Sequence, residues 1–419
     1  MSKIVKAKYT SEAVPGFTHR TAMEEAARCL LCHDAPCSKG CPAGTDPAKF
    51  IRSIRFKNPK GAVETIRENN VLGGTCARVC PYDNLCEEAC SRCGIDRPIE
   101  IGKLQRYAVE QEKAFGLKTL KITGKKKATK VACVGAGPAS LACAAELAKE
   151  GYQVTIFEKE EKAGGVLTYG ITPSKLPQEV VDHDIEQIRA LGVKFEFGKN
   201  VGENIDLFKM DFDAIFIGVG LWGSKLPDLP NIHLPGVYTA VDFLKNARMQ
   251  EEGFKFGEKV LVVGGGNVAV DCAVTAKLLG AAEVHIIYRR TLEEAPANMS
   301  EFHYALSLGI DVTTNMALEA LEGDSLLEYV LFKGRDGKSE LKLLTDTVVF
   351  AIGQKAEDMT KIVPVELTDK GEIKTDKSGK TSDPRVFAAG DIVNGGKTVA
   401  EAVKEGKQAA ISIIEYLTN

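Results

Sequence analysis

Long apolar runs and aromatic residues are scarce in this sequence of 419 residues, of which 7% are aromatic. No run of about 18 apolar residues occurs, which excludes an ordinary transmembrane helix. Residues 1–8 also lack the apolar segment of a signal peptide. Lys and Arg (54) nearly balance Asp and Glu (57), so a net charge of −3 gives no global attraction to nucleic acid or a membrane. We therefore expect a soluble, cytoplasmic protein with neither kind of partner.

Cysteine is also scarce, except in one short segment. Nine of the twelve cysteines lie between residues 29 and 93, which leaves three for the rest of the chain. Cytosolic thiols stay reduced, so such a concentration favours metal or iron-sulfur ligation over disulfides. The three isolated cysteines, Cys133, Cys143 and Cys272, fall in expected strands or helices, where we expect them to pack in a core.

The concentrated cysteines form two blocks with regular spacing. The first is C-x2-C-x4-C-x3-C-P and the second is C-x3-C-P-x4-C-x3-C, and together they comprise Cys29, Cys32, Cys37, Cys41, Cys76, Cys80, Cys86 and Cys90. Eight thiolates with Cys-Pro endings fit two four-iron clusters. Zinc is the alternative. It usually takes paired C-x2-C knuckles, a spacing found only at Cys29/Cys32 and Cys90/Cys93.

Short helices are expected around the two cysteine blocks. Apolar residues recur at helical spacing in residues 19–32, in residues 49–69 with a break at Asn58-Pro59, and in residues 104–115. The polar run at 124–127 is interpreted as a linker to the rest of the chain. At about 150 residues per domain, the length of the chain predicts two to three domains.

After the linker, a strand, a glycine-rich turn, a helix and a second strand follow one another twice. The first copy has Gly135, Gly137 and Ser140 in its turn and Glu158 at the end of its second strand. Such a turn lets the backbone approach a pyrophosphate, and the carboxylate accepts hydrogen bonds from an adenosine ribose. The predicted fold class is therefore α/β, with two Rossmann-like dinucleotide-binding domains preceded by an α-helical domain that carries the cysteines.

The second copy differs from the first at the end of its second strand. Its G-x-G-x-x-A turn begins at Gly264, and its second strand is followed by Arg289-Arg290 instead of an acid. Guanidinium groups pair with a 2'-phosphate, which favours NADPH over NADH. Alternatively, these arginines point into solvent or hold the acidic pair Glu293-Glu294.

A further glycine motif lies near the end of the chain. Residues 386–392 read Val-Phe-Ala-Ala-Gly-Asp-Ile, and residues 396–400 and an expected terminal helix follow. With the two copies above, and with strands expected at 212–220 and 348–353, this order resembles the two-dinucleotide-domain flavoprotein reductases. In that family the Asp, here Asp391, contacts the FAD ribityl chain, and the next helix, here beginning near Thr398, points its N-terminus at the flavin. The alternative is that these are ordinary strand-turn-helix glycines.

This resemblance implies two sets of cofactor-binding residues. FAD is expected at Gly135, Gly137, Pro138, Ala139, Glu158, Lys159, Gly165, Gly390, Asp391, Thr398 and Val399. NAD(P)H is expected at Gly264, Gly266, Asn267, Val268, Arg289, Arg290 and Gly353. No redox C-x-x-C accompanies the flavin motif, so we expect electrons to leave by another route, with no side chain acting as a catalytic nucleophile.

The cysteine segment carries a closer resemblance, which extends over essentially the whole chain. Residues 27–37, 65–70 and 98–105 resemble the electron-input half of dihydropyrimidine dehydrogenase, a separate subunit in bacteria. The wider family includes the small subunit of glutamate synthase. The family pattern implies one [4Fe-4S] cluster on Cys29, Cys32, Cys37 and Cys90, and another on Cys41, Cys80, Cys86 and Gln105. Cys76 and Cys93 remain as alternatives to Gln105.

The resemblance also implies a domain order and an activity. We expect a two-cluster domain at 1–124, an FAD-binding domain at 125–254 and 355–419, and an NAD(P)H-binding domain at 255–354. The implied activity is hydride transfer from NAD(P)H to FAD, then single-electron transfer through the clusters. The acceptor is an FMN-containing partner subunit, in a heterotetramer, which reversibly reduces uracil or thymine to the 5,6-dihydropyrimidine. The family expectation of NADH opposes the indication from the arginine pair.

Two other functions are compatible with the same motifs. One is that of another electron-transfer enzyme, the small subunit of a glutamate synthase or a ferredoxin-linked NAD(P)H oxidoreductase. The other is that of a binding module that has kept the fold and lost its cofactors. The complete set of glycines, acids and cysteines argues against the second.

Overall fold

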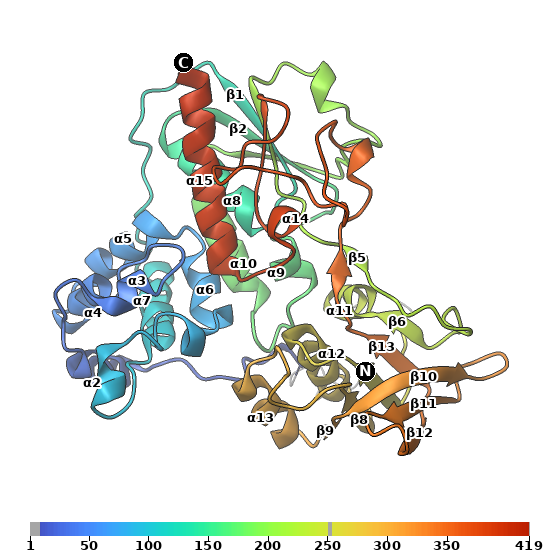
Figure 1. Cartoon of the computed structure of the whole chain (residues 1–419). Coiled ribbons are helices and arrows are strands. Elements are labelled where there is room, and N and C mark those ends of the chain that lie inside the picture. The colour runs from blue at the N-terminus through green and yellow to red at the C-terminus, as the bar shows by residue number, and fades with distance from the viewer. Residues whose placement is uncertain (1–8, 250–253, 419) are drawn as a thin grey trace. The chain divides into compact units, whose positions relative to one another are not determined.

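The computed structural model describes residues 9–249 and 254–418, and the chain divides into two compact units (Figure 1). The larger unit comprises Val14–Thr168, Gln178–Leu221 and the residues from Ala356 onward. The smaller unit comprises the residues up to Ala13, Tyr169–Pro177 and Trp222–Lys355. Across these described residues, no helix is long and apolar enough to cross a membrane.

The larger unit is built on a five-stranded parallel sheet in the order β15-β4-β1-β2-β3. Its strands are β1 (Lys130–Val134), β2 (Gln153–Glu158), β3 (Lys194–Phe197), β4 (Ala214–Ile217) and β15 (Val386–Ala388). The central strands β1 and β4 are apolar and buried, as expected for a parallel sheet covered by helices. Strand β15 pairs with β4, which brings the C-terminal glycine motif back to the first sheet.

The helices that follow β1 and lie outside residues 222–355 are α8 (Pro138–Lys149), α9 (Val166–Tyr169), α10 (Gln178–Arg189), α14 (Asp391–Asn394) and α15 (Val399–Thr418). Of these, α8 and α15 pack against strands of the sheet. The C-terminal helix α15 lies beside α8 (Figure 1). Gly406 permits this close approach, because a Cβ at that position would collide with the Ala139 carbonyl of α8.

Residues 14–117 of the larger unit form helices and loops and are called the helical region below. The helices are α2 (His19–Arg28), α3 (Pro36–Lys39), α4 (Pro47–Arg55), α5 (Pro59–Asn69), α6 (Gly73–Val79) and α7 (Ile101–Phe115), with 3-10 turns at Tyr82–Asn84 and Ser91–Gly94. Side chains of Thr18, Asp46 and Asn58 cap α2, α4 and α5 by accepting first-turn N–H groups. Phe50 and Leu104 lie in the buried apolar core.

The structure confirms one local expectation for the helical region and corrects two. The break between α4 and α5 lies at Asn58-Pro59, as expected. The first helix ends at Arg28 and not at 32, and the chain then turns through Leu31 with a φ of +51°. Helix α6 was not expected, because Gly-Gly disfavours a helix. Burial explains it, since a Cβ on Gly74 would lie 2.9 Å from a carboxylate oxygen of Asp184.

The smaller unit has a parallel sheet in the order β6-β13-β7-β8-β9 and a separate antiparallel sheet β10-β11-β12. The parallel strands are β6 (Val237–Thr239), β7 (Lys259–Val263), β8 (Glu283–Ile287), β9 (Asp311–Thr313) and β13 (Thr347–Phe350). The antiparallel strands are β10 (Met316–Glu322), β11 (Tyr329–Gly334) and β12 (Glu340–Leu344), and a short pair is formed by β5 (Gly223–Ser224) and β14 (Gln354–Lys355). The helices are α11 (Ala240–Met249), α12 (Asn267–Leu278) and α13 (Met299–Ser307).

The parallel sheet of the smaller unit includes residues before 255, which were expected in the FAD-binding domain. Strand β6 pairs with β13, and Phe243 of α11 shares a buried core with Val270 of α12. The compact unit that contains the second sheet resumes at Trp222, whereas the NAD(P)H-binding domain is predicted to begin at residue 255. The three-residue strand β6 is too short to produce a recognisable apolar pattern in the sequence.

Candidate functional site

The first glycine turn, residues 135–140, leaves open space at the N-terminus of α8. Gly135 has a φ of +84°, and a Cβ there would lie 2.9 Å from the Gly218 carbonyl oxygen. Gly137 is the N-cap of α8 and has no side chain to accept the first N–H groups. A Cβ on Gly165 would lie 2.9 Å from Gly137 Cα, so a further glycine lines this space. Free N–H groups and a helix dipole fit a pyrophosphate.

Glu158 lies at the edge of the same turn, at the end of β2. Its carboxylate accepts hydrogen bonds from the N–H groups of Ala136 at 2.7 Å and Glu160 at 3.0 Å, and the residue is 6% exposed. Burial raises the pKa of Glu158, and the two N–H groups oppose that shift. The structure thus brings the expected ribose-binding acid to the glycine turn. Lys159 instead forms an exposed ion pair with Glu357 at 3.0 Å.

The C-terminal motif lies against the same glycine turn. Gly390 has a φ of +79°, and a Cβ there would lie 2.9 Å from the Ala139 Cβ. Burial raises the pKa of Asp391, whose carboxylate accepts the Lys397 N–H at 3.2 Å. Helix α15 then begins at Val399, as expected.

Thr398 starts α15 through a reciprocal cap. Its hydroxyl accepts the Glu401 N–H at 3.2 Å, and its own N–H donates to the Glu401 carboxylate at 3.1 Å. Glu405, one turn later, accepts the Gly390 N–H at 2.9 Å. These contacts fix the start of α15 relative to the Gly390-Asp391 turn.

A cavity of about 700 Å³ lies over the second glycine turn, in the smaller unit. A Cβ on Gly264 would collide with the Ala351 carbonyl, and Gly266 is the uncapped N-terminus of α12. The cavity is large enough for a nucleotide. All the nicotinamide-site residues expected from the sequence line it, namely Gly264, Gly266, Asn267, Val268, Arg289, Arg290 and Gly353.

The walls of this cavity include residues that the sequence did not suggest. They come from the segment after β5, including Pro227 and Leu229, and from β10, including Met316 and Leu318. These residues are far from the glycine turn in sequence. Only the pairing of strands in the smaller unit brings them together, so no local pattern could have identified them.

Arg289 and Arg290 are exposed side chains that line the cavity. Neither forms an ion pair with an acidic residue in the described part of the chain. Glu294, one of the acids proposed as an alternative partner, accepts from the Thr291 N–H at 3.0 Å and pairs with Arg335 at 2.9 Å. Both guanidinium groups therefore remain available to an anionic ligand.

Four cysteine thiols of the helical region form what we call the first thiol group, namely those of Cys29, Cys32, Cys37 and Cys90. Burial raises the pKa of Cys29, and the nearby thiols of Cys90 and Cys32 raise it further. Burial raises the pKa of Cys37 to about 11, again with contributions from Cys90 and Cys29. These effects indicate that Cys32 and Cys90 lie near Cys29, and that Cys90 and Cys29 lie near Cys37. They also mean that ionising the group needs a compensating positive charge, which iron supplies.

The second thiol group consists of Cys41, Cys80 and Cys86, with Cys76 beside it. A hydrogen bond with Cys76 and burial raise the pKa of Cys80, and Cys86 and Cys41 add to the effect. Burial also raises the pKa of Cys86, with Cys41 among its neighbours. The two blocks of the sequence thus contribute to both groups.

Gln105 lies on α7, which packs against α6. Its amide Nε2 donates to the Gly73 carbonyl of α6 at 2.8 Å, and the side chain is buried. The exposed Cys93 donates instead to the backbone carbonyls of Glu87 at 3.4 Å and Glu88 at 3.6 Å. Of the three alternatives for the eighth ligand, Cys76 lies beside the second thiol group, and Gln105 is anchored to the helix that carries Cys76.

The donor set suits four-iron clusters. Within residues 9–249 and 254–418, no three His, Cys, Asp or Glu side chains are close enough to share one metal ion. A four-iron cluster attaches each ligand to a different iron, so its ligands need not meet at one point. Both cysteine blocks contribute thiols to each group, and thiolates are the ligands that such a cluster takes.

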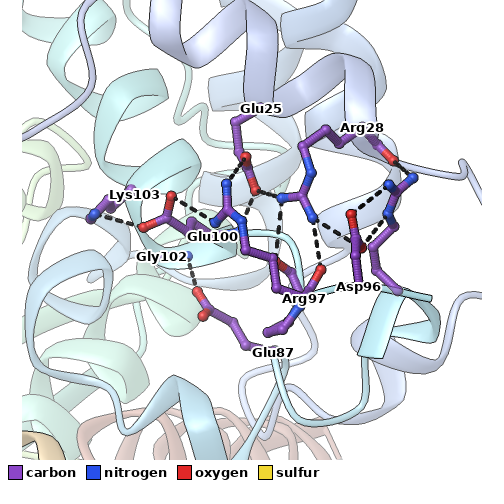
Figure 2. Close-up of polar contacts among 10 residues, drawn as sticks. Glu25, Arg28, Glu87, Asp96, Arg97, Glu100, Gly102 and Lys103 are labelled. Atoms are coloured by element: carbon purple, nitrogen blue, oxygen red, sulfur yellow. Dashed lines mark hydrogen bonds and ion pairs between the residues drawn. The ribbon is translucent and has the colours of Figure 1, made fainter. Parts of the chain in front are cut away.

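A network of ion pairs joins α2 to the loop before α7 (Figure 2). The buried carboxylate of Glu25 pairs with Arg28 at 2.5 Å and Arg97 at 3.2 Å. Asp96 pairs with Arg28 at 3.2 Å and Arg92 at 2.8 Å, and Arg92 also donates to the Arg28 carbonyl at 3.0 Å. Arg28 precedes Cys29, and Arg92 follows Cys90. The network therefore connects the two chain segments that supply the first thiol group.

Glu87, which lies in the second cysteine block, contacts the start of α7 (Figure 2). Its carboxylate accepts the Gly102 N–H at 3.0 Å. Burial raises the pKa of Glu87 to about 7. The first turn of α7 is thus hydrogen-bonded to Glu87, the residue that follows Cys86.

Comparisons with known proteins agree with these two parts of the chain. Residues 129–406 match the family described as pyridine nucleotide-disulphide oxidoreductase. Residues 6–117 match the family described as dihydropyrimidine dehydrogenase domain II, 4Fe-4S cluster. The resemblance stated from the sequence is confirmed, and so are FAD, NAD(P) and 4Fe-4S iron-sulfur as cofactor types.

Two relatives resemble the chain over nearly its whole length. The NAD-dependent dihydropyrimidine dehydrogenase subunit PreT of Escherichia coli K12 is 45% identical over 413 residues, which are 98% of this chain and 97% of the relative. The small chain of glutamate synthase [NADPH] from the same organism is 32% identical over 454 aligned positions, covering 99% and 95%. Among solved structures, FprA of Mycobacterium tuberculosis in complex with NADPH matches with a TM-score of 0.61 and 18% identity, over 70% of this chain and 85% of its own. That likeness supports the fold.

Proposed function

The chain belongs to the pyridine nucleotide-disulphide oxidoreductase family and to the family of NAD-dependent dihydropyrimidine dehydrogenase subunits, and from this membership we propose that it is the electron-input subunit of a pyrimidine reductase. One observation carries the proposal. A chain 45% identical to such a subunit over 98% of its length keeps both glycine turns open and its cysteines in two groups.

The first glycine turn is proposed to hold FAD. Its backbone N–H groups would bind the pyrophosphate, Glu158 the ribose, and Asp391 the ribityl chain. The N-terminus of α15 after Thr398 would stabilise negative charge on the flavin ring. Bound FAD supplies the conversion of a two-electron hydride into single electrons, so no side chain has to act as nucleophile.

The second glycine turn is proposed to hold the nicotinamide dinucleotide. Uncapped N–H groups at Gly266 would bind the pyrophosphate, and the arginine pair Arg289-Arg290 is suited to a 2'-phosphate. The relatives' names specify NAD, whereas the arginines favour NADPH. A kinetic comparison of the two nucleotides is given below.

The thiol groups are proposed to bind two four-iron clusters. Cys29, Cys32, Cys37 and Cys90 would hold one, and Cys41, Cys80, Cys86 and Gln105 the other. Cys29, Cys37 and Cys90 act on one another, and so do Cys41, Cys80 and Cys86, while Cys37 also acts on Cys86; the partition itself follows the family pattern. Gln105 is the eighth ligand that the family pattern implies, and Cys76, which contacts Cys80, is the alternative.

A partner subunit is proposed to complete the reaction. It would carry FMN, form a heterotetramer with this chain in the cytoplasm, and reduce uracil or thymine reversibly to the 5,6-dihydro base. The present chain would supply the electrons. This role requires that electrons pass from this chain to the partner subunit. It does not require a pyrimidine-binding site in this chain.

The proposal is tested by supplying the acceptor. Anaerobically purified chain, reduced with NADH or NADPH, should stay reduced when uracil is added alone. It should become reoxidised, with dihydrouracil formed, once an FMN-containing dihydropyrimidine-reducing subunit is present. Reoxidation instead by a large glutamate synthase subunit with glutamine and 2-oxoglutarate, and not by the FMN subunit, would contradict the proposal.

A further inference from the structure

Lys407 connects the flavin side of the larger unit with the helical region. It lies on α15, and its Nζ donates to the carbonyl of Ala43 at 3.0 Å and to the carbonyl of Asn69 at 2.7 Å. Ala43 follows Cys41-Pro42, and Asn69 is the last residue of α5. The C-terminal carbonyls of a helix have no partner within the helix and carry partial negative charge. One ammonium group therefore holds a segment from the first cysteine block and the end of α5.

The charge of Lys407 is not neutralised by a carboxylate. In the described part of the chain it forms no ion pair, and the two acids that act on its pKa, Glu146 and Glu68, are paired with other lysines. Glu146 pairs with Lys149 at 2.9 Å, and Glu68 pairs with Lys49 at 3.6 Å. Two carbonyl groups solvate the ammonium group but leave its net charge in place.

The charge lies beside the chain segment that carries Cys41, because Ala43, whose carbonyl accepts from Lys407, is two residues after Cys41. Burial lowers the pKa of Lys407, while Glu146, Cys41 and Glu68 act in the opposite direction. Electrostatic effects are reciprocal, so the ammonium group also acts on Cys41. Partial burial strengthens the interaction, because the effective dielectric constant is lower than in water.

We propose that Lys407 is a positioning residue that raises the reduction potential of the cluster bound by the second thiol group. The inference rests on the proposed function, because it requires iron on Cys41. Each electron transferred from the reduced flavin oxidises the flavin by one electron and adds one negative charge to the cluster. A fixed cation beside Cys41 stabilises that added charge. No bond to Lys407 forms or breaks, and no proton moves there.

Three variants separate the charge from the hydrogen bonds. Lys407→Gln keeps N–H donors and removes the charge, whereas Lys407→Arg keeps both. Lys404→Gln removes an exposed lysine from the same helix and serves as the matched control. Each full-length variant is titrated anaerobically, and the reduced clusters are counted by electron paramagnetic resonance at a series of fixed potentials.

In Lys407→Gln, the reduced-to-oxidised ratio of one cluster should fall about tenfold at a given potential, which corresponds to a shift of about 59 mV for a one-electron couple. In Lys407→Gln, the potential of the other cluster should equal that in the unmutated chain. In Lys407→Arg and in Lys404→Gln, the potentials of both clusters should equal those in the unmutated chain. Equal potentials in Lys407→Gln and the unmutated chain, at full iron content, would overturn the inference. Equal shifts in the Gln and Arg variants would also overturn it. An unmutated chain without iron would overturn the proposed function as well.

Discussion

The helical region and the two parallel sheets are stabilised in different ways. The central strands of both sheets are apolar and buried, and the glycine turns follow two of these strands. The helical region has an apolar core of its own, around Phe50 and Leu104, and adds ion pairs such as Glu25–Arg28 and half-buried thiols. We infer that the sheets fold with or without nucleotides, whereas the helical region needs its clusters.

Removal of one cluster ligand should test this contrast with the largest effect. Cys37→Ser should eliminate about four iron atoms per chain and lower the free energy of unfolding of the helical region by about 4 kcal/mol or more. Iron analysis and thermal unfolding measure both effects. Cys272→Ala, at a buried cysteine in the smaller unit, is the control and should retain all iron. Unchanged iron in Cys37→Ser would remove Cys37 from the ligand set.

A side chain that fills the first glycine turn should have the opposite effect, namely loss of FAD and retention of iron. Gly135→Val places a branched side chain at a φ of +84° against the Gly218 carbonyl, so FAD affinity should fall at least about 100-fold while iron content stays the same. Flavin fluorescence after gel filtration measures the retained FAD. Gly192→Val, at a φ of +88° with open space around it, shares the backbone strain and should keep FAD. Equal FAD loss in both variants would show that strain alone is responsible.

The arginine pair sharpens the comparison between the two turns. If both guanidinium groups bind a 2'-phosphate, charge-assisted hydrogen bonds of about 1.5–3 kcal/mol each imply at least a tenfold preference for NADPH in kcat/KM. Arg290→Glu should reverse this preference through repulsion. Rapid-mixing measurements of flavin reduction at equal, low nucleotide concentrations give the ratio. Faster reduction by NADH in the unmutated chain would mean that the arginines do not select the nucleotide.

The smallest expected change concerns the eighth ligand. Gln105→Ala should alter the paramagnetic signal of one cluster and leave the rate of flavin reduction within about twofold, because the ligand acts on the cluster and not on the sheets. Cys93→Ala, at an exposed thiol, is the control. A normal signal in Gln105→Ala that is lost in Cys76→Ala would assign the eighth ligand to Cys76.

The same contrast explains what the sequence could predict. Strand, turn and helix follow one another locally, so Gly135, Glu158 and Gly264 were enough to predict the α/β class and both turns, which the structure confirms. In the helical region, cysteine spacing predicted the chemistry but not all of the structure. Helix α6 was missed because its glycines are dictated by tertiary contacts, such as that between Gly74 and Asp184.

Long-range contacts account for the rest of what the sequence left out. The cavity wall from β10 and the early start of the smaller unit at Trp222 depend on strand pairing between distant segments. Lys407 reaches Ala43 across more than 360 positions of the chain. A half-buried lysine on a terminal helix gives no sign in the sequence that it bonds the segment after a cysteine block.

The central claim is that one chain combines a flavin site with two iron-sulfur clusters. Its most direct test is the measurement of metal and flavin content in anaerobically purified protein. The account predicts a brown protein with about eight iron atoms and about one FAD per chain. One or two zinc ions with no iron would contradict it.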